Sequence, residues 1–174
     1  TTFGKGEVIW EVPVLGEGNS SPIIGGLNVY VTAAQFNSET KKGVRTLSAF
    51  SLHTGELEWK YEAPFTTYKT NKRNGFASST PCADAQGVYV FWQSEEGSVL
   101  LAFDHDGKER WQYDVGQFGA GTGAATSPIV HEGRVLLSHD NEKYESFLLA
   151  VSSESGTREW QTIRKTQRTG YATP

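Results

Sequence analysis

The stretch AFSLHTGELEW, residues 49–59, returns twice further along the chain. The corresponding stretches are AFDHDGKERW at residues 102–111 and AVSSESGTREW at residues 150–160. Each begins in an apolar run, passes through a turn that contains glycine, and closes on tryptophan. A glycine in this place can adopt the positive φ that a tight hairpin turn requires. The three stretches therefore predict three related β-hairpins.

Two independent markers give this repeat a period near 50. The first is tryptophan, and the intervals of 49, 52 and 49 residues separate Trp10, Trp59, Trp111 and Trp160. The second is a hydroxyl residue before proline, which occurs at Ser21-Pro22, Thr80-Pro81, Ser127-Pro128 and Thr173-Pro174. Coincidence of two such markers indicates a true internal repeat.

Four short segments recur within each period. In the first repeat they are SSPII (20–24), NVYVTAA (28–34), RTLSAFSL (45–52) and ELEWKYE (56–62). They are rich in Val, Leu, Tyr and Phe and are bounded by turn residues, which indicates antiparallel strands. Proline opens the first segment, where its missing N–H does least harm to strand pairing. Four strands in a repeat of this length are typical of a β-propeller blade.

The sequence thus predicts an all-β protein: a β-propeller with three four-stranded antiparallel blades and partial blade strands at both ends. The expected blades are about 20–63, 78–115 and 125–164. Residues 7–14 would be the closing strand of another blade, and residues 171–174 the start of the next one. Three blades cannot close a ring, so we expect a fragment of a six- to eight-bladed ring. The alternative is closure by assembly of several copies.

The repeat resembles the tryptophan-docking motif of quinoprotein alcohol dehydrogenases. That motif has alanine first, an acidic residue two places on, then Thr-Gly, and tryptophan at the eleventh place. Ser51 and Ser152 stand at the acidic place in two repeats, whereas Asp104 keeps the acid in a repeat that is one residue shorter. The chain is similar to the pyrroloquinoline-quinone-like (PQQ-like) β-propeller repeat family, which includes the outer-membrane-assembly lipoprotein. The phrases at 16–24, 74–81 and 121–128 look most like its uncharacterised bacterial branch.

This resemblance carries two implications. In the family, the tryptophan packs between neighbouring blades and the small alanine makes room for it. The resemblance therefore implies a structural, blade-docking role, and no role as a ligand cage, for Trp10, Trp59, Trp111 and Trp160. It also implies a periplasmic or secreted protein.

Composition excludes several functional classes. The net charge of −4 predicts no general attraction to nucleic acid or to an anionic membrane. The single cysteine, Cys82, excludes an intrachain disulfide. No stretch approaches the roughly 20 apolar residues of a membrane-spanning helix.

The sequence also lacks a recognisable catalytic or metal-binding constellation. The segment Asp104-His-Asp106-Gly could begin a calcium loop, but the remaining ligands are missing and a turn is the better interpretation. His131 and His139 flank one short hairpin without a partner cysteine, so we expect no zinc site. We therefore predict no catalytic residues, no metal and no cofactor.

One surface pattern suggests binding. In a four-stranded blade, the 2–3 loops and the blade-to-blade loops share one face of the disc. The candidate binding residues on this face are Lys69, Lys72, Arg73, Arg164, Lys165 and Arg168. The longest loop, roughly 62–78, lies there too, and long loops on a rigid scaffold often carry function. We expect this face to bind a protein or an anionic ligand. The alternative is a solvated surface with a chance excess of charge.

Three functions remain in competition. The leading hypothesis is a non-enzymatic binding or scaffold propeller outside the cytoplasm. The alternative is the N-terminal part of a PQQ-dependent (quinoprotein) alcohol dehydrogenase-like oxidoreductase, with PQQ and calcium bound in the full-length protein. A propeller hydrolase or lyase for sugars would need paired carboxylates, which are not evident.

Overall fold

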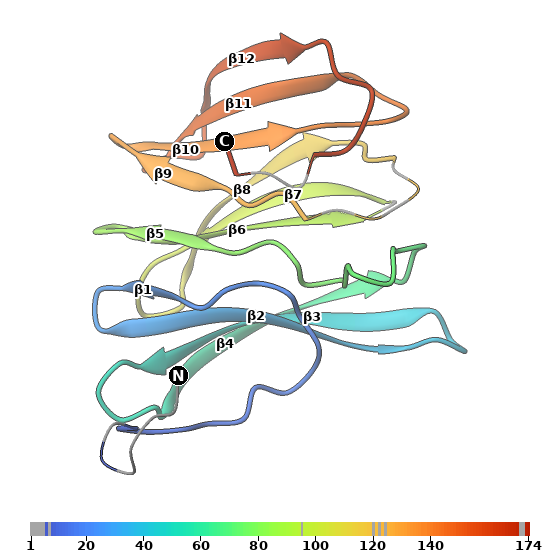
Figure 1. The fold of residues 1–174 in the computed structure, drawn as a ribbon. Coiled ribbons are helices and arrows are strands. Elements are labelled where there is room, and N and C mark those ends of the chain that lie inside the picture. The colour runs from blue at the N-terminus through green and yellow to red at the C-terminus, as the bar shows by residue number, and fades with distance from the viewer. Residues whose placement is uncertain are drawn as a thin grey trace.

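The computed structural model describes residues 6, 8–94, 96–119, 121, 123, 125–170 and 173–174. All regular elements among them are β-strands, in three four-stranded antiparallel sheets. Each sheet is built from four strands that are consecutive in the sequence, and the three sheets stack one above another as successive blades (Figure 1). The described part of the chain contains no helix that could cross a membrane. The predicted all-β propeller architecture is confirmed.

The strand bounds follow the four segments of each repeat. The first sheet contains β1 (Ile23–Gly25), β2 (Asn28–Asn37), β3 (Lys42–Ser51) and β4 (Leu57–Thr66). The second contains β5 (Cys82–Asp84), β6 (Gly87–Ser94), β7 (Gly97–Phe103) and β8 (Glu109–Gly116). The third contains β9 (Ile129–His131), β10 (Arg134–His139), β11 (Ser146–Ser152) and β12 (Arg158–Arg164).

Local chemistry explains where these strands begin and turn. The first strand of each sheet begins directly after a proline, at Ile23, Cys82 and Ile129. In the turn between β7 and β8, the Oδ1 atom of Asp104 accepts hydrogen bonds from the backbone N–H groups of Asp106 (3.1 Å) and Lys108 (2.8 Å). Asp104 therefore shapes a hairpin turn, as the turn interpretation predicts.

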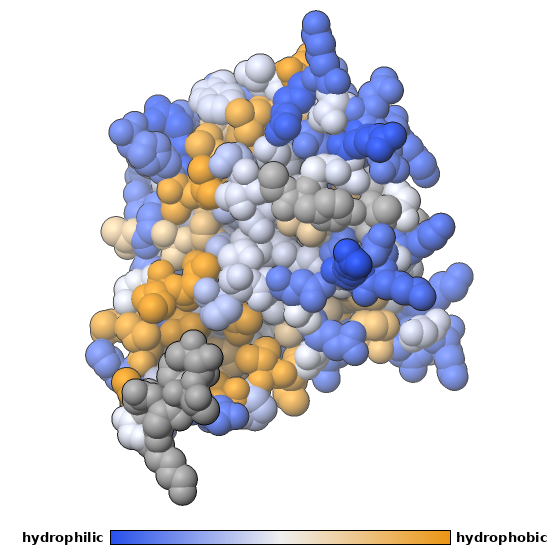
Figure 2. Space-filling model, viewed as in Figure 1, coloured by the Kyte–Doolittle hydropathy of each residue, from blue (hydrophilic) through white to orange (hydrophobic). Residues whose placement is uncertain are grey.

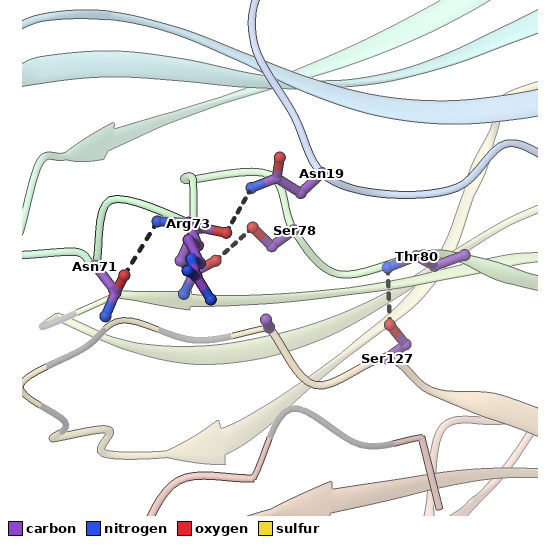
Figure 3. Close-up of a pocket in the computed structure, with 8 residues that line it drawn as sticks. Asn19, Asn71, Arg73, Ser78, Thr80 and Ser127 are labelled. Carbon is purple, nitrogen blue, oxygen red and sulfur yellow. Dashed lines mark hydrogen bonds between the residues drawn. The ribbon is translucent and has the colours of Figure 1, made fainter.

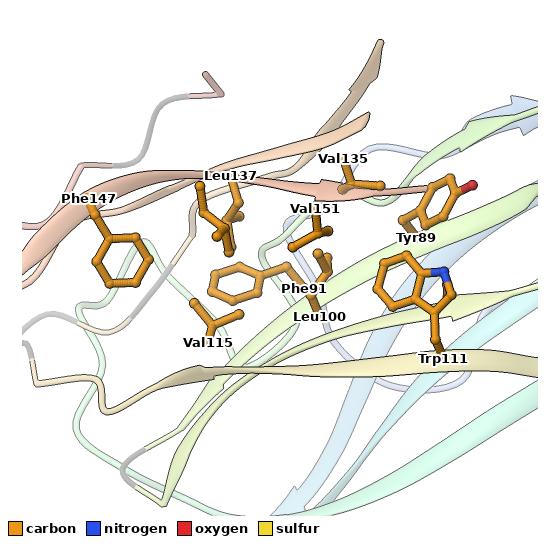
Figure 4. Close-up of a cluster of buried hydrophobic side chains, with 11 residues drawn as sticks. Tyr89, Phe91, Leu100, Trp111, Val115, Val135, Leu137, Phe147 and Val151 are labelled. Atoms are coloured by element: carbon orange, nitrogen blue, oxygen red, sulfur yellow. The ribbon is translucent and has the colours of Figure 1, made fainter. Parts of the chain in front are cut away.

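Apolar side chains fill the spaces between blades. Strand β6 is buried on both faces, because Val88, Val90 and Trp92 point into the core shared with the first blade. Tyr89 and Phe91 point the other way, into the core shared with the third blade (Figure 4). The alternation of a strand with period two thus joins all three blades through the middle one.

The short first strands form one edge of the stack. Strand β1 lies beside β5, and β5 lies beside β9. We call this edge, with the segments 16–22, 67–81 and 117–128 that lead into it, the inner edge, because a closed propeller would place its central channel there.

The predicted end segments are only partly visible. Residue 7 and residues 171–172 lie outside the described residues, and residues 8–14 and 173–174 form no strand. The closing strand at 7–14 and the new blade at 171–174 therefore stay predictions. Strand β12 is exposed along its whole length.

Candidate binding site

Hydroxyl residues link the three blades along the inner edge. The backbone N–H of Ser21 donates to Oγ1 of Thr80 (3.0 Å), and the N–H of Thr80 donates to Oγ of Ser127 (2.9 Å). Beside them, the N–H of Asn19 donates to the carbonyl of Ala77 (3.0 Å). These bonds hold together three segments that are remote in the sequence.

A pocket of about 470 Å³ opens at this junction. It is lined by Asn19, Asn71, Arg73, Asn74, Ser78, Thr80, Ala125 and Ser127 (Figure 3). We call it the inner-edge pocket. Its volume lies in the usual range for small-molecule sites. The lining offers amides, hydroxyls and one guanidinium, with no carboxylate among these residues.

The loop that carries Arg73 is held by its own polar side chains. Oδ1 of Asn71 accepts a hydrogen bond from the N–H of Arg73 (3.1 Å), and Nδ2 of Asn19 donates to the carbonyl of Arg73 (3.3 Å). Ser78 supports the same loop by accepting at Oγ from the N–H of Gly75 (3.0 Å). The guanidinium of Arg73 makes no hydrogen bond or ion pair with the described residues. It is therefore available to an anion.

The six predicted basic residues do not form one continuous cluster. Arg73 lines the inner-edge pocket. Lys69 lines a separate hollow of about 420 Å³ beside Lys41. A third hollow of about 670 Å³ on the last blade is lined by Arg164, Lys165 and Arg168, and Lys72 is exposed elsewhere on the loop. Hydrophilic side chains cover the side where the β2–β3 and β6–β7 hairpins lie (Figure 2).

The charge of Arg164 is partly compensated within its own blade. Its Nε atom lies 3.3 Å from Oδ1 of Asp140, a largely buried carboxylate, and its Nη1 atom donates to Oγ of Ser138 (2.8 Å). Arg164 is thus less available to a ligand than Arg73.

Three of the four repeat tryptophans share one geometry. Each indole N–H donates to a backbone carbonyl in the following repeat, from Trp10 to Leu52 (2.9 Å), Trp59 to His105 (2.8 Å) and Trp111 to Ser153 (3.0 Å). The ring also covers the turn glycine, since a Cβ atom at Gly156 would lie 2.6 Å from Trp111. Trp160 is 39% exposed and makes no such bond within the described chain.

Sequence reasoning missed most of the pocket lining. Asn19, Asn74 and Ser78 lie in the phrases 16–24 and 74–81, which marked the family resemblance but no site, and Asn71 lies in no repeated phrase. Thr80 and Ser127 were visible as the hydroxyl residues before proline, but only as strand openers. Their recurrence at one place in each repeat was the available signal, because equivalent positions in propeller blades gather around one axis.

No metal centre emerges from the described residues. No group of three or more His, Cys, Asp and Glu side chains is placed to hold an ion there. His139 is buried, and its burial lowers the pKa of the imidazole. Burial also raises the pKa of the Cys82 thiol, which favours its protonated form.

Comparison with known proteins decides the family. The family model for PQQ-like repeats, described as "Outer membrane protein assembly factor BamB", matches residues 3–173. The chain belongs to the PQQ-like repeat family. No curated protein matches this PQQ-like chain.

Solved structures place the PQQ-like chain among propellers. It is similar to the quinohemoprotein alcohol dehydrogenase of Comamonas testosteroni, with 20% identity, a TM-score of 0.60, and coverage of 85% of this chain and 21% of that one. The quinohemoprotein alcohol dehydrogenase ADHIIG of Pseudomonas putida HK5 has 18% identity, a TM-score of 0.60, and coverage of 88% and 22%. A europium-containing methanol dehydrogenase has 20% identity, a TM-score of 0.56, and coverage of 86% and 25%.

These likenesses concern the fold. The chain spans a quarter or less of the length of each of these three proteins. Its three blades therefore correspond to part of a larger propeller.

Proposed function

We propose that these blades belong to a non-enzymatic binding propeller whose inner-edge pocket takes a small ligand with a carboxylate or phosphate group. The observation that carries the proposal concerns Arg73: its guanidinium has no partner among the described residues, and the described lining of its pocket offers amide and hydroxyl groups and no carboxylate. Guanidinium binds planar or tetrahedral anions through two parallel hydrogen bonds. Asn and Ser side chains around it can donate further bonds to the same anion.

We place the protein outside the cytoplasm. Support comes from the matching family model, whose description is that of an outer membrane protein assembly factor. The anion would then be a small solute of that compartment. Lys69 and Lys72 would add long-range attraction for such an anion, because both are exposed on the loop that carries Arg73.

Calorimetry tests this function in the protein expressed from its complete natural coding sequence. Citrate and inorganic phosphate serve as the probes. Arg73→Gln should weaken the binding of at least one probe tenfold or more, because a hydrogen bond to a charged group is lost. The triple change of Lys69, Lys72 and Arg73 to Glu should abolish binding.

Lys108→Gln is the matched control, since Lys108 is an exposed cation of the β7–β8 turn outside the pocket. The Lys108→Gln variant should bind the probes with the same affinity as the unmodified protein. Equal affinity of the Arg73→Gln variant, or an equal loss in the Lys108→Gln control, would contradict the proposal.

The second candidate function is a PQQ-dependent alcohol dehydrogenase, suggested by the titles of the similar structures. The donors of the inner-edge pocket suit the carboxylates of the quinone, but the pocket lining has no carboxylate for a calcium ion. These blades therefore do not fit a complete calcium–quinone site, and its cation ligands would have to come from other blades. Quinone absorbance together with calcium-dependent alcohol oxidation in the complete protein would favour this candidate over binding alone.

A further inference from the structure

A buried cation lies beneath the loop that carries Arg73. Arg45 belongs to strand β3, and only 4% of its surface is exposed. Its Nε atom donates to the carbonyl of Phe76 (2.6 Å). Its Nη2 atom donates to the carbonyl of Gln93 (2.6 Å) and to the hydroxyl of Tyr68 (3.2 Å). One guanidinium therefore ties both ends of segment 68–76 to strand β6 of the next blade.

Aromatic rings complete the surroundings of this guanidinium. Its central carbon lies 4.4 Å from the centroid of the Phe65 ring, a distance typical of a cation–π contact. Phe76 packs against Phe65 and Tyr68, with ring centroids 5.0 and 5.2 Å away. The hydroxyl of Tyr68 also donates to the carbonyl of Gln93 (3.0 Å). Loop, ring cluster and neighbouring blade thus meet at Arg45.

The other two blades use a different residue at this position. Counting four residues back from the alanine that faces each repeat tryptophan gives Arg45 in β3, Ser98 in β7 and Ser146 in β11. Burial of a charge is costly unless hydrogen bonds compensate it. Burial lowers the pKa of Arg45 accordingly. Arg45, whose charge is costly to bury, thus occurs in the blade that is followed by the longest loop.

We propose that Arg45 is the positioning residue of the inner-edge pocket: by clamping Tyr68 and Phe76 against Gln93, it fixes the loop that presents Asn71, Arg73 and Asn74 to an anion. The effect on ligand binding rests on the proposed function. The effect on the loop itself does not.

Hydrogen exchange of the complete protein tests the clamp without any ligand. Arg45→Ser installs the residue of the other two blades. It should speed amide exchange in residues 69–75 at least tenfold and leave exchange in β10 and β11 unchanged. Arg134→Ser is the control, because Arg134 forms an exposed ion pair with Glu159 in the third blade. Unchanged exchange at 69–75 in the Arg45→Ser variant would overturn the proposal.

Probe affinity then tests the positioning. If the unmodified protein binds citrate or phosphate, Arg45→Ser should weaken binding at least tenfold although Arg45 does not line the pocket. A loop that exchanges faster while affinity stays unchanged would overturn the positioning role. If the unmodified protein binds neither probe, the proposed function is wrong. Hydrogen exchange in residues 69–75 of the Arg45→Ser variant then still tests whether Arg45 holds the loop. Should the Arg45→Ser variant not fold, Arg45→Lys keeps the charge without the forked donors and should give the same loop effect to a smaller degree.

Discussion

At the scale of single residues, the contact between tryptophan and turn glycine is the most regular feature of the molecule. The glycines at 55, 107 and 156 have φ values of 74°, 87° and 70°, and each lies under the indole ring of the preceding repeat. A side chain at these positions would meet two obstacles, namely unfavourable φ and the ring itself. The same glycine therefore serves both the hairpin turn and the packing between blades.

Two alanine substitutions separate these obstacles. Gly133 has a φ of 74° and open space where a Cβ atom would lie, whereas Gly156 has a φ of 70° and the Trp111 ring 2.6 Å from that place. Gly133→Ala should cost about 1 kcal/mol of unfolding free energy, the penalty for the left-handed region. Gly156→Ala should cost a further 1–3 kcal/mol, roughly the penalty of overpacking. Urea unfolding of both variants measures the difference, and equal losses would contradict the docking role of Trp111.

A buried histidine gives the fold a dependence on pH. His139 is 1% exposed, and its ring nitrogens face the side-chain amide of Gln93 (3.3 Å) and the carbonyl of Gln117 (3.1 Å). Nε2 also lies 2.8 Å from Nδ2 of Asn141, which itself donates to the Gln117 carbonyl (3.0 Å), so polar groups surround the buried ring. Burial lowers the pKa of His139, so the folded protein resists protonation longer than the unfolded chain does.

The sign of the pH effect follows from this difference. As pH falls through about 6.5, the unfolded chain binds a proton at His139 before the folded protein does, so stability decreases. One such group contributes a slope of at most about 1.4 kcal/mol per pH unit. Urea unfolding between pH 7.5 and 5 should show this loss, and it should be smaller in a His139→Gln variant. Identical pH slopes in the two proteins would refute the assignment.

At the scale of elements, the hydroxyls of Thr80 and Ser127, each before a proline, link the starts of neighbouring first strands. The bond from Ser21 N–H to Thr80 Oγ1 and the bond from Thr80 N–H to Ser127 Oγ repeat the same step from blade to blade. Proline at the following position donates no backbone hydrogen bond, so the hydroxyl residue supplies the last donor before each strand. These two hydrogen bonds, which we call the hydroxyl relay, fix the positions of neighbouring blades relative to one another along the inner edge.

Thr80→Val tests the relay. It removes the acceptor of the Ser21 N–H and keeps the shape of the side chain, and the expected loss is about 1 kcal/mol of unfolding free energy. Thr80→Ser retains the hydroxyl and serves as the control. If chemical denaturation finds Val and Ser variants equally stable, the relay contributes nothing to blade packing.

The strands were predictable because their signals are local. Segment 28–34 is rich in β-branched and apolar residues and follows directly on a glycine turn, and β2 indeed begins at Asn28 and extends to Asn37. The pocket was only partly predictable. Arg73 was a candidate, but Asn19 and Ser127 join it through packing of three blades, which no local pattern encodes. Arg45 was visible only as a strand residue, because nothing in a strand pattern indicates a buried cation.

At the scale of the whole molecule, the last blade differs from the middle one. Trp111 on β8 is 9% exposed, because the third blade covers it, whereas its counterpart Trp160 on β12 is 39% exposed. An apolar side chain at this exposure in an outer strand suits cover by a further blade. We predict that the complete protein covers β12 with another PQQ-like blade.

Cysteine labelling measures that cover. Thr162→Cys lies on the same face of β12 as Trp160, and in the complete protein it should react with a maleimide at least tenfold more slowly than Glu154→Cys, which lies in an exposed turn. The native Cys82 adds little background, since burial raises the pKa of its thiol. Equal labelling rates at the two engineered positions would show that β12 remains open.

A crystal structure of the complete protein with citrate tests the anion site at the inner edge of these blades most directly. The pocket must be free of lattice contacts in the crystal form used. We predict a bound carboxylate about 2.7–2.9 Å from the guanidinium of Arg73, with Asn19, Asn74 or Ser127 as further partners. Citrate bound only elsewhere, or an empty inner-edge pocket at saturating citrate, would contradict this prediction.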